Sequence, residues 1–379
     1  MARVVQDKAM STGYAAGTVP PPLSAPPPIT KHRRRRSVLG VVVLFVVIAA
    51  LGAALGIWLP HRDRGALTAL TGVDPTTSAV ATPTLTPTPT TPPFDPNVGA
   101  ILPDHRIVAF YAVPGAAVTG PAYVLSASML ARLRTQGAAY EALDPEHPVQ
   151  LGIDLVVSVP DRFKGKSGTY SHHVSDAVID SYVDFCRKND LLLFLDLNIG
   201  WADPVTELMS FSEYLKLPFV EVAVDPEWMF PRHNGIPGVN LSNVRASDLN
   251  PMIEAVANMP MEYHVPRKVM IIHQYRGDGD GKADPYDPGS SEIADKRNIT
   301  NDPRVDLVIH IDSVGGWPGD IAVKEAQYHK WVALDMQKYD NFRYGGFKIF
   351  YKLEARHRLM TPAEVMSMKP QPMVITYGN

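Results

Sequence analysis

The feature that most constrains the fold is an alternation of short apolar segments with helix-like stretches, which begins after Asn97. Each apolar segment has the length of a strand, and strands that alternate with helices favour a parallel sheet covered by helices. Eight such segments predict a (β/α)8 barrel, and the alternative is an open, doubly wound α/β sheet. The predicted strands are Ile107–Ala112, Leu151–Val157, Leu191–Leu197, Phe219–Val224, Lys268–Gln274, Val305–Ile311, Phe347–Tyr351 and Met373–Tyr377.

Several stretches between these segments carry helix start signals. Ser175 is predicted to cap an amphipathic helix with the sequence SDAVIDSYVDFCRKND. A second helix is predicted from Ser247, and a third from Thr361, with Pro362 at its first position. The sequence SASMLARLRTQ predicts a helix between the first two strands. These helices support an alternating α/β architecture.

The N-terminal part of the chain has a different character. No charged residue occurs from Val38 to Leu59, and a helix of this length, roughly 33 Å, matches a bilayer core. The preceding KHRRRR sequence predicts a cytoplasmic N-terminus, so an uncleaved anchor is preferred over a cleaved signal peptide. The predicted parts are a Pro-rich and basic cytoplasmic tail, a transmembrane helix, a Thr/Pro-rich extracellular stalk and an extracytoplasmic barrel, over residues 1–36, 37–60, 61–100 and 101–379.

Composition adds few constraints on binding partners. The net charge of −3 is close to neutral, and no nucleic-acid partner is expected. The single cysteine, Cys186, cannot form an internal disulfide, so the apolar core must hold the domain together. The sequence shows no metal-ligand spacing, P-loop or nucleophile elbow, and no metal or cofactor is predicted. The acidic segment Arg276–Pro288 is interpreted as a solvated loop rather than a calcium site.

Alternation along the strands predicts which side chains enter the barrel. In FVEVAVDPEW the three valines form one apolar face, which should meet the helices. Ala223, Asp225 and Glu227 share the opposite face and should emerge at the mouth, where barrel enzymes carry their active sites. The same alternation directs Asp196 and Asn198, then His310 and Asp312, to the same rim. The rim is therefore predicted to gather several acids.

Two carboxylates at this spacing interact, so that one stays ionised while the other keeps its proton near neutral pH. Glycosidic cleavage needs a general acid of this kind. Glu227 is the predicted acid, and Asp225 is predicted to tune its pKa. Asp196 or Asp312 is predicted as base or electrostatic stabiliser, with Glu354 as a second-choice partner. The competing interpretation is that Asp225 with its following proline only turns the chain.

A further set of residues is predicted to bind substrate, through aromatic faces that stack on sugar rings or through polar groups near the mouth. The strand Lys268–Gln274 delivers either His273 or Gln274 to this region, and a core role for His273 is the alternative. The predicted substrate-binding residues are Tyr111, Asn198, Trp228, His273, Gln274, Tyr275, Tyr351 and Tyr377.

A resemblance to known sequences supports the same interpretation. In order, the segments VAFYAVPG, LDLNIGW, VAVDPEW, PGVNLSNV, KVMIIHQY, HIDSVGG, GGFKIFYK and VITYG resemble an uncharacterised family of exported actinobacterial barrel proteins, often labelled lipoproteins. The resemblance covers nearly all of residues 105 to 378. More distantly, the D-x-E segment is similar to chitinase-like and lysozyme-like glycoside hydrolases, which implies Glu227 as acid and Asp225 as its neighbour. Of the longer D-x-x-D-x-D-x-E pattern, only these two residues match.

Together these observations predict a membrane-anchored, extracytoplasmic protein of glycoside-hydrolase type that acts on cell-envelope polysaccharide. The alternative is a non-catalytic module that binds or scaffolds the cell envelope on the same fold.

Overall fold

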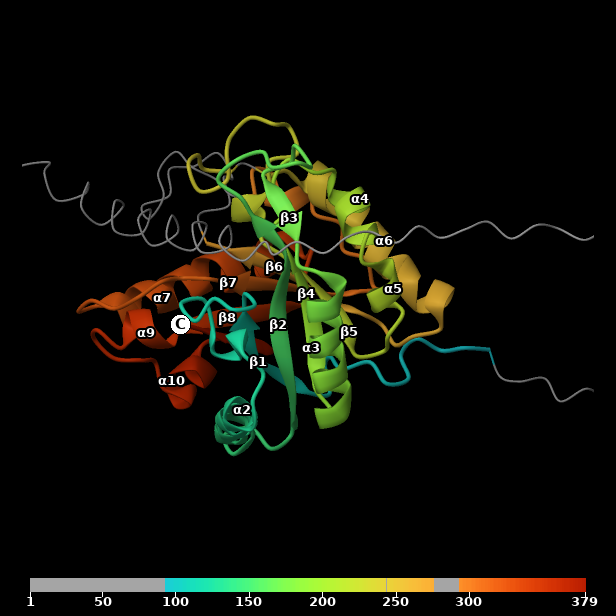
Figure 1. Ribbon diagram of the computed structural model, residues 1–379. Coiled ribbons are helices and arrows are strands. Elements are labelled where there is room, and N and C mark those ends of the chain that lie inside the picture. Colours follow the sequence, from blue (N-terminus) through green and yellow to red (C-terminus); the bar gives the residue numbers. More distant parts are fainter. Residues whose placement is uncertain (1–92, 243, 276–292) are drawn as a thin grey trace, which may run out of the picture. The chain divides into compact units, whose positions relative to one another are not determined.

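A computed structural model describes residues 93–242, 244–275 and 293–379 of the chain (Figure 1). Eight parallel strands pair in sequence, and β1 contacts both β2 and β9, which closes the ring into a barrel. This closure confirms the (β/α)8 prediction and excludes the open sheet. The barrel strands are β1 (Arg106–Ala112), β2 (Val149–Pro160), β4 (Leu192–Leu197), β5 (Val220–Val224), β6 (Val269–Gln274), β7 (Asp306–Ile311), β8 (Tyr344–Phe350) and β9 (Val374–Gly378).

All eight predicted strands are present, with ends that differ by a few residues. A short additional strand, β3 (Ser171–His173), pairs antiparallel with the end of β2 and was not predicted. Figure 1 shows β3 lying against the far end of the long strand β2. Because β2 passes the rim of the barrel there, this hairpin extends the wall at the C-terminal end.

Helices lie outside the ring of strands (Figure 1). Ser175 is the N-cap residue of α3, as predicted, and Thr361 caps α10 by accepting a hydrogen bond from the Glu364 amide. Helix α6 begins one residue before the predicted Ser247. The described helices are α2 (Ala127–Glu141), α3 (Asp176–Asn189), α4 (Pro204–Met209), α5 (Ser212–Leu215), α6 (Ala246–Tyr263), α7 (Asp320–Tyr328), α8 (Leu334–Tyr339), α9 (Tyr351–Glu354) and α10 (Pro362–Ser367).

The predicted cytoplasmic tail, membrane helix, most of the stalk and the acidic loop Arg276–Pro288 fall outside the described residues. Among the helices that the structure describes, none is both long and apolar enough to cross a bilayer. The last residues of the predicted stalk contact the barrel, because the Arg267 amide donates to the Pro96 carbonyl at 2.7 Å. The Arg267 guanidinium also donates to the Asn97 side chain.

The two faces of each barrel strand meet different surroundings, as the alternation predicted. Val220, Val222 and Val224 of β5 are buried in the large core between strands and helices. Ala223 points the other way, into a second apolar cluster inside the barrel. This inner cluster occupies the lower part of the lumen and comprises Leu102, Ile107, Leu192, Phe194, Ala223, Val269, Ile271, Val308 and Val374. The lumen is therefore packed with side chains at its N-terminal end.

The hairpin of β2 and β3 is tied to α4 by a small polar cluster. The Glu207 carboxylate accepts hydrogen bonds from the Ser158 hydroxyl at 2.5 Å and from His173 Nε2 at 2.8 Å. The hydrogen bond to Glu207 raises the pKa of His173, although partial burial opposes this shift. The charged imidazolium therefore stabilises the folded hairpin.

The pH dependence of stability should reveal this contact. Since the folded-state pKa of His173 is raised, its contribution is complete below the unfolded-state value and disappears as pH rises through the folded-state value. His173→Gln should therefore lower the free energy of unfolding at about pH 5.5 and change it little at about pH 9. The loss should stay below about 1 kcal/mol, because the side chain is 44% exposed. Urea denaturation at both pH values measures it.

Glu207→Gln is the matched control, because it removes the charged acceptor and keeps the side-chain shape. In that background, His173→Gln should have the same effect at both pH values. If the effect of His173→Gln on stability still changed with pH in that background, another group would be titrating in place of His173.

Candidate functional site

Charged side chains fill the upper part of the lumen, above the apolar cluster. Strands β2, β4, β6, β7 and β8 each direct at least one of them inward, and the residue that follows β5 adds another. None of these side chains belongs to a residue more than 7% exposed. The group consists of Asp154, Asp196, Asp225, His273, His310, Asp312 and Lys348. Burial of so many ionisable groups is costly unless they pair or have a use.

Asp312 is the centre of a hydrogen-bonded cluster in this layer. One of its oxygens accepts from His273 Nδ1 at 2.9 Å and from His310 Nδ1 at 2.8 Å. Its other oxygen accepts from the Lys348 ammonium at 2.7 Å. Burial opposes ionisation, but His273 and Lys348 outweigh it and hold the pKa of Asp312 well below its usual range. Asp312 is therefore a fixed carboxylate, which suits electrostatic stabilisation better than proton abstraction.

The two histidines differ in charge because their surroundings differ. Burial lowers the pKa of His310 to about 4, so its ring is neutral. His310 donates from Nδ1 to Asp312, and its Nε2 accepts from the Thr376 hydroxyl at 3.2 Å. For His273 burial also disfavours the charged form, but Asp312 outweighs it and raises the pKa to about 9. The structure thus selects His273, not Gln274, as the inward residue of β6.

Asp154 and Asp196 lie on neighbouring strands beside His273. Neither oxygen of either carboxyl group has a hydrogen-bond partner among the described residues. Burial, followed by the charge of Asp196, raises the pKa of Asp154 to about 7, and burial also raises the pKa of Asp196. The Tyr111 hydroxyl favours the ionised form of Asp196, but no hydrogen bond of normal geometry reaches it. His273 Nε2 faces Asp154 at 3.6 Å.

The predicted acid pair lies at the mouth, directly after β5. The Asp225 amide donates to the Leu197 carbonyl at 3.2 Å, which fixes this turn to the end of β4. Pro226–Trp228 then form a single 3-10 turn, and the Trp228 amide donates back to the Asp225 carbonyl. Asp225 is 5% exposed, whereas Glu227 is only half-buried. Burial, and next the charge of Glu227, raise the pKa of Asp225 well above its usual range.

Asp225 and Glu227 therefore lie on one turn, where the charge of Glu227 together with burial disfavours ionisation of Asp225. The Asp-Pro turn of the competing interpretation is also present, so the turn and the acid pair coexist. Asn198, which follows β4, is 2% exposed, and its Nδ2 has no hydrogen-bond partner among the described residues. Trp228 and Tyr275 are half-buried after β5 and β6.

Four predicted site residues lie elsewhere, which corrects those predictions. Tyr377 is buried on the helix side of β9, where its hydroxyl is 2.7 Å from that of Tyr140 on α2. Tyr351 stacks on Tyr377, with ring centroids 4.9 Å apart, so neither ring is a sugar platform at the mouth. Gln274 points away from the lumen and accepts from the Lys296 ammonium at 2.8 Å.

Glu354 is the fourth correction. Its carboxylate forms a buried ion pair with Lys324 and also accepts from the Phe350 amide at 3.1 Å. Both side chains of the ion pair are 1% exposed. A carboxylate neutralised in this way is a structural partner of Lys324 and does not provide an acid for the mouth.

Tyr111 does point into the lumen, but one of its faces is already covered. The Lys348 ammonium lies 3.8 Å from the centre of the Tyr111 ring, a cation–π contact that also orients the lysine. Three lumen residues were missing from the predicted site: His310, which alternation placed at the rim without a role, and the two residues Asp154 and Lys348, which were not predicted at all. Asp154 and Lys348 are charged residues inside the apolar strand sequences GIDLV and GFKIF, and this is the signal that would have identified them.

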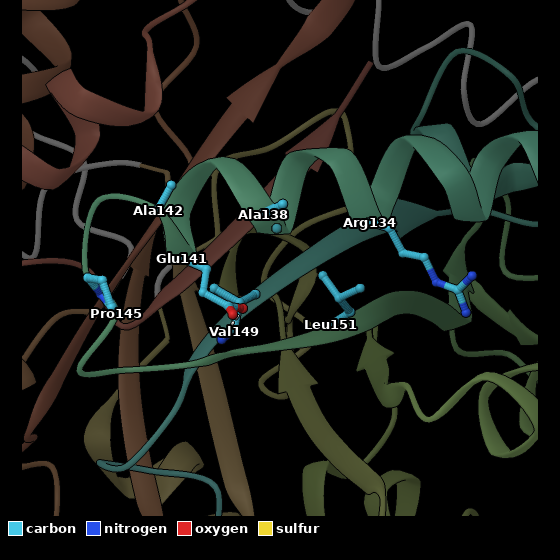
Figure 2. Close-up of a pocket in the computed structure, with 8 residues that line it drawn as sticks. Arg134, Ala138, Glu141, Ala142, Pro145, Val149 and Leu151 are labelled. Atoms are coloured by element: carbon cyan, nitrogen blue, oxygen red, sulfur yellow. Dashed lines mark hydrogen bonds between the residues drawn. The ribbon is translucent and has the colours of Figure 1, made fainter.

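A pocket of about 400 Å³ lies on the outside of the barrel between α2 and β2 (Figure 2). Figure 2 shows Arg134, Ala138 and Glu141 of α2 opposite Val149 and Leu151 of β2. Val149 begins β2, so this pocket is near the N-terminal end of the strands. None of the predicted site residues lines it.

The fold and the lumen define the protein as a (β/α)8 barrel whose mouth carries an acid pair above a buried cluster of carboxylates, histidines and a lysine. No family model and no curated protein matches the sequence.

Proposed function

We propose that the protein is a carbohydrate-active enzyme of glycoside-hydrolase type, anchored in the membrane by Val38–Leu59 and acting on cell-envelope polysaccharide outside it. The observation that carries this proposal is the position of Asp225 and Glu227, side by side on one turn at the C-terminal end of a barrel strand. Catalytic residues of barrel enzymes occupy this position, and glycosidic cleavage requires carboxyl groups.

In the proposed reaction, Glu227 meets the glycosidic oxygen because it is the more exposed of the two acids. The pair carries one proton, since two neighbouring carboxyl groups do not ionise together easily. Glu227 gives that proton to the leaving oxygen as the bond from carbon to this oxygen breaks. Water then forms the new bond to the sugar carbon, and the proton it releases restores the acid. Trp228, half-buried on the same turn, would stack on a neighbouring sugar ring.

A non-catalytic cell-envelope module is the second candidate, and a specific observation favours it. Asp312 and Glu354 are both neutralised by buried lysines, so only part of the acid set at this end is available for chemistry. A barrel of this kind would bind polysaccharide at its mouth without cleaving it.

Incubation of the full-length protein with soluble cell-wall polysaccharides, followed by measurement of new reducing ends, distinguishes the two. Enzymatic function predicts reducing ends that increase with time and protein concentration. Glycan binding without new reducing ends would support the module, and the absence of both binding and cleavage would contradict both proposals.

A further inference from the structure

The lumen contains a second set of groups that the acid pair at the mouth does not use. Asp154 on β2 and Asp196 on β4 present four carboxylate oxygens without hydrogen-bond partners among the described residues. Both residues are fully buried. His273 of β6 directs its Nε2 toward Asp154 at 3.6 Å, beyond hydrogen-bond distance, and its side chain is 1% exposed. Buried polar atoms are nearly always satisfied, so five such atoms on three neighbouring side chains indicate a missing partner.

Charge identifies the kind of partner that is missing. The upper lumen contains the carboxyl groups of Asp154, Asp196, Asp225 and Asp312. Against these it offers Lys348 and the imidazoles of His273 and His310, and all three already donate to Asp312. Lys348 is already bound to Asp312, so its ammonium does not satisfy the oxygens of Asp154 and Asp196. The unsatisfied oxygens therefore call for a cation.

The orientation of His273 is that of a metal ligand. Its Nδ1 donates to the Asp312 carboxylate at 2.9 Å, which turns Nε2 toward the two free carboxyl groups. Metal-binding histidines are commonly held in this way, with a carboxylate on the ring nitrogen that does not touch the metal. The alternative trio of His273, His310 and Asp312 does not offer the same site, since both Nδ1 atoms are already bonded to one Asp312 oxygen.

The spacing of the ligand atoms agrees with this assignment. Two ligands that bind one tetrahedral zinc ion at about 2.1 Å are separated by about 3.4 Å. His273 Nε2 and an Asp154 oxygen are 3.6 Å apart. Candidate ligand atoms of Asp154, Asp196 and His273 all lie within 4.8 Å of one another. Small rotations of the carboxyl groups would bring all three onto one ion, and the Nε2 proton of His273 would be released to solvent as the ion binds.

We propose that Asp154, Asp196 and His273 bind a divalent cation in the barrel lumen, below the acid pair. One imidazole and two carboxylates form a mixed nitrogen and oxygen set that suits Zn²⁺ better than Mg²⁺, because Mg²⁺ prefers oxygen ligands. Three protein ligands leave a fourth position for water or a substrate oxygen. This inference does not depend on the proposed function, because the site is defined by residues other than Asp225 and Glu227.

The test is zinc binding by the full-length protein without any glycan. After treatment with EDTA, the protein is dialysed against Zn²⁺, and bound metal is measured by elemental analysis and isothermal titration calorimetry. One Zn²⁺ per chain is expected, and saturating zinc should raise the melting temperature because it binds only the folded state. Mg²⁺ should raise it less.

Variants locate the ion. Asp154→Asn and Asp196→Asn keep the side-chain volume and should each abolish the stoichiometric site. Asp312→Asn should weaken zinc binding by about 10- to 100-fold, because Asp312 orients His273 and is not itself a ligand of the ion. Asp161→Asn is the matched control: Asp161 also faces a histidine, His172, at 2.9 Å, but that pair is at the surface. This variant should bind zinc like the wild type.

Two outcomes would overturn the proposal. One is wild-type protein that binds no stoichiometric zinc, and this result is informative even if a lumen variant fails to fold. The other is zinc affinity that is unchanged in folded Asp196→Asn, which would place the ion elsewhere. If the wild-type protein binds no zinc but cleaves polysaccharide, the zinc proposal fails and the proposed function stands. If it binds zinc but cleaves no polysaccharide, only the proposed function is contradicted.

Discussion

Glu227→Gln is expected to reduce polysaccharide cleavage by about 10²- to 10⁴-fold while the barrel stays folded. Glutamine keeps the shape of the side chain but has no proton to give to the leaving oxygen. Because Glu227 is half-buried at the rim, its replacement should change the circular dichroism spectrum and melting temperature little. The loss should appear in kcat rather than KM, since proton transfer occurs in the transition state. Initial rates of reducing-end formation measure both constants.

The control for this variant is Glu146→Gln, which removes an exposed carboxylate and should leave the rates unchanged. Asp225→Asn gives a second comparison, because Asp225 is the other carboxyl group of the pair. Its effect should not add to that of Glu227→Gln in the double variant, as expected for two groups that act together. Wild-type rates in folded Glu227→Gln would remove this residue from the mechanism.

Lys348→Met is expected to have the largest effect on stability, about 3 to 5 kcal/mol in the free energy of unfolding. Lys348 donates to Asp312 at 2.7 Å inside the lumen, and its ammonium also interacts with Asp154 and Asp225. Methionine fills a similar volume but leaves these acids without their cation. Burial would then force them to bind protons or to admit water, and both processes favour the unfolded chain. Urea denaturation near neutral pH measures the loss.

Lys188→Met is the matched control, because Lys188 is exposed on α3, and it should change stability by less than about 0.5 kcal/mol. The double variant Lys348→Met with Asp312→Asn should recover part of the loss, since it removes a buried charge together with its partner. If Lys348→Met were as stable as the wild type, the lumen acids would not depend on this lysine.

The barrel could be predicted because the sequence signal for each of its strands is local. Each strand is a short apolar run bounded by helix or turn signals, and closure follows once eight such units are arranged in order. Alternation within a strand also predicted which side of β5 and β7 faces inward. Asp225 and Asp312 were therefore placed correctly on the inner side of the barrel, from their spacing in the sequence to the valines and isoleucines of the same strands.

The partners of the site residues could not be predicted in the same way, because they come from distant parts of the chain. Lys348 reaches Asp312 from a different strand, and Lys324 reaches Glu354 from a different helix. These contacts decide which acid is available and which is neutralised. The aromatic predictions failed for a related reason. Tyr377 is at a position of β9 whose side chain points toward the helices. Tyr351 lies beyond the end of β8, where alternation no longer applies.

The apolar cluster at the N-terminal end of the lumen limits how a polymer can use the mouth. Phe194, Ile271 and their neighbours fill the barrel from wall to wall, and Leu102 adds to the seal from below. Under the proposed function, a long glycan cannot thread through a barrel filled in this way, so it must lie across the mouth. Whatever enters must leave by the same route, and cleavage would then release both fragments on one side of the protein.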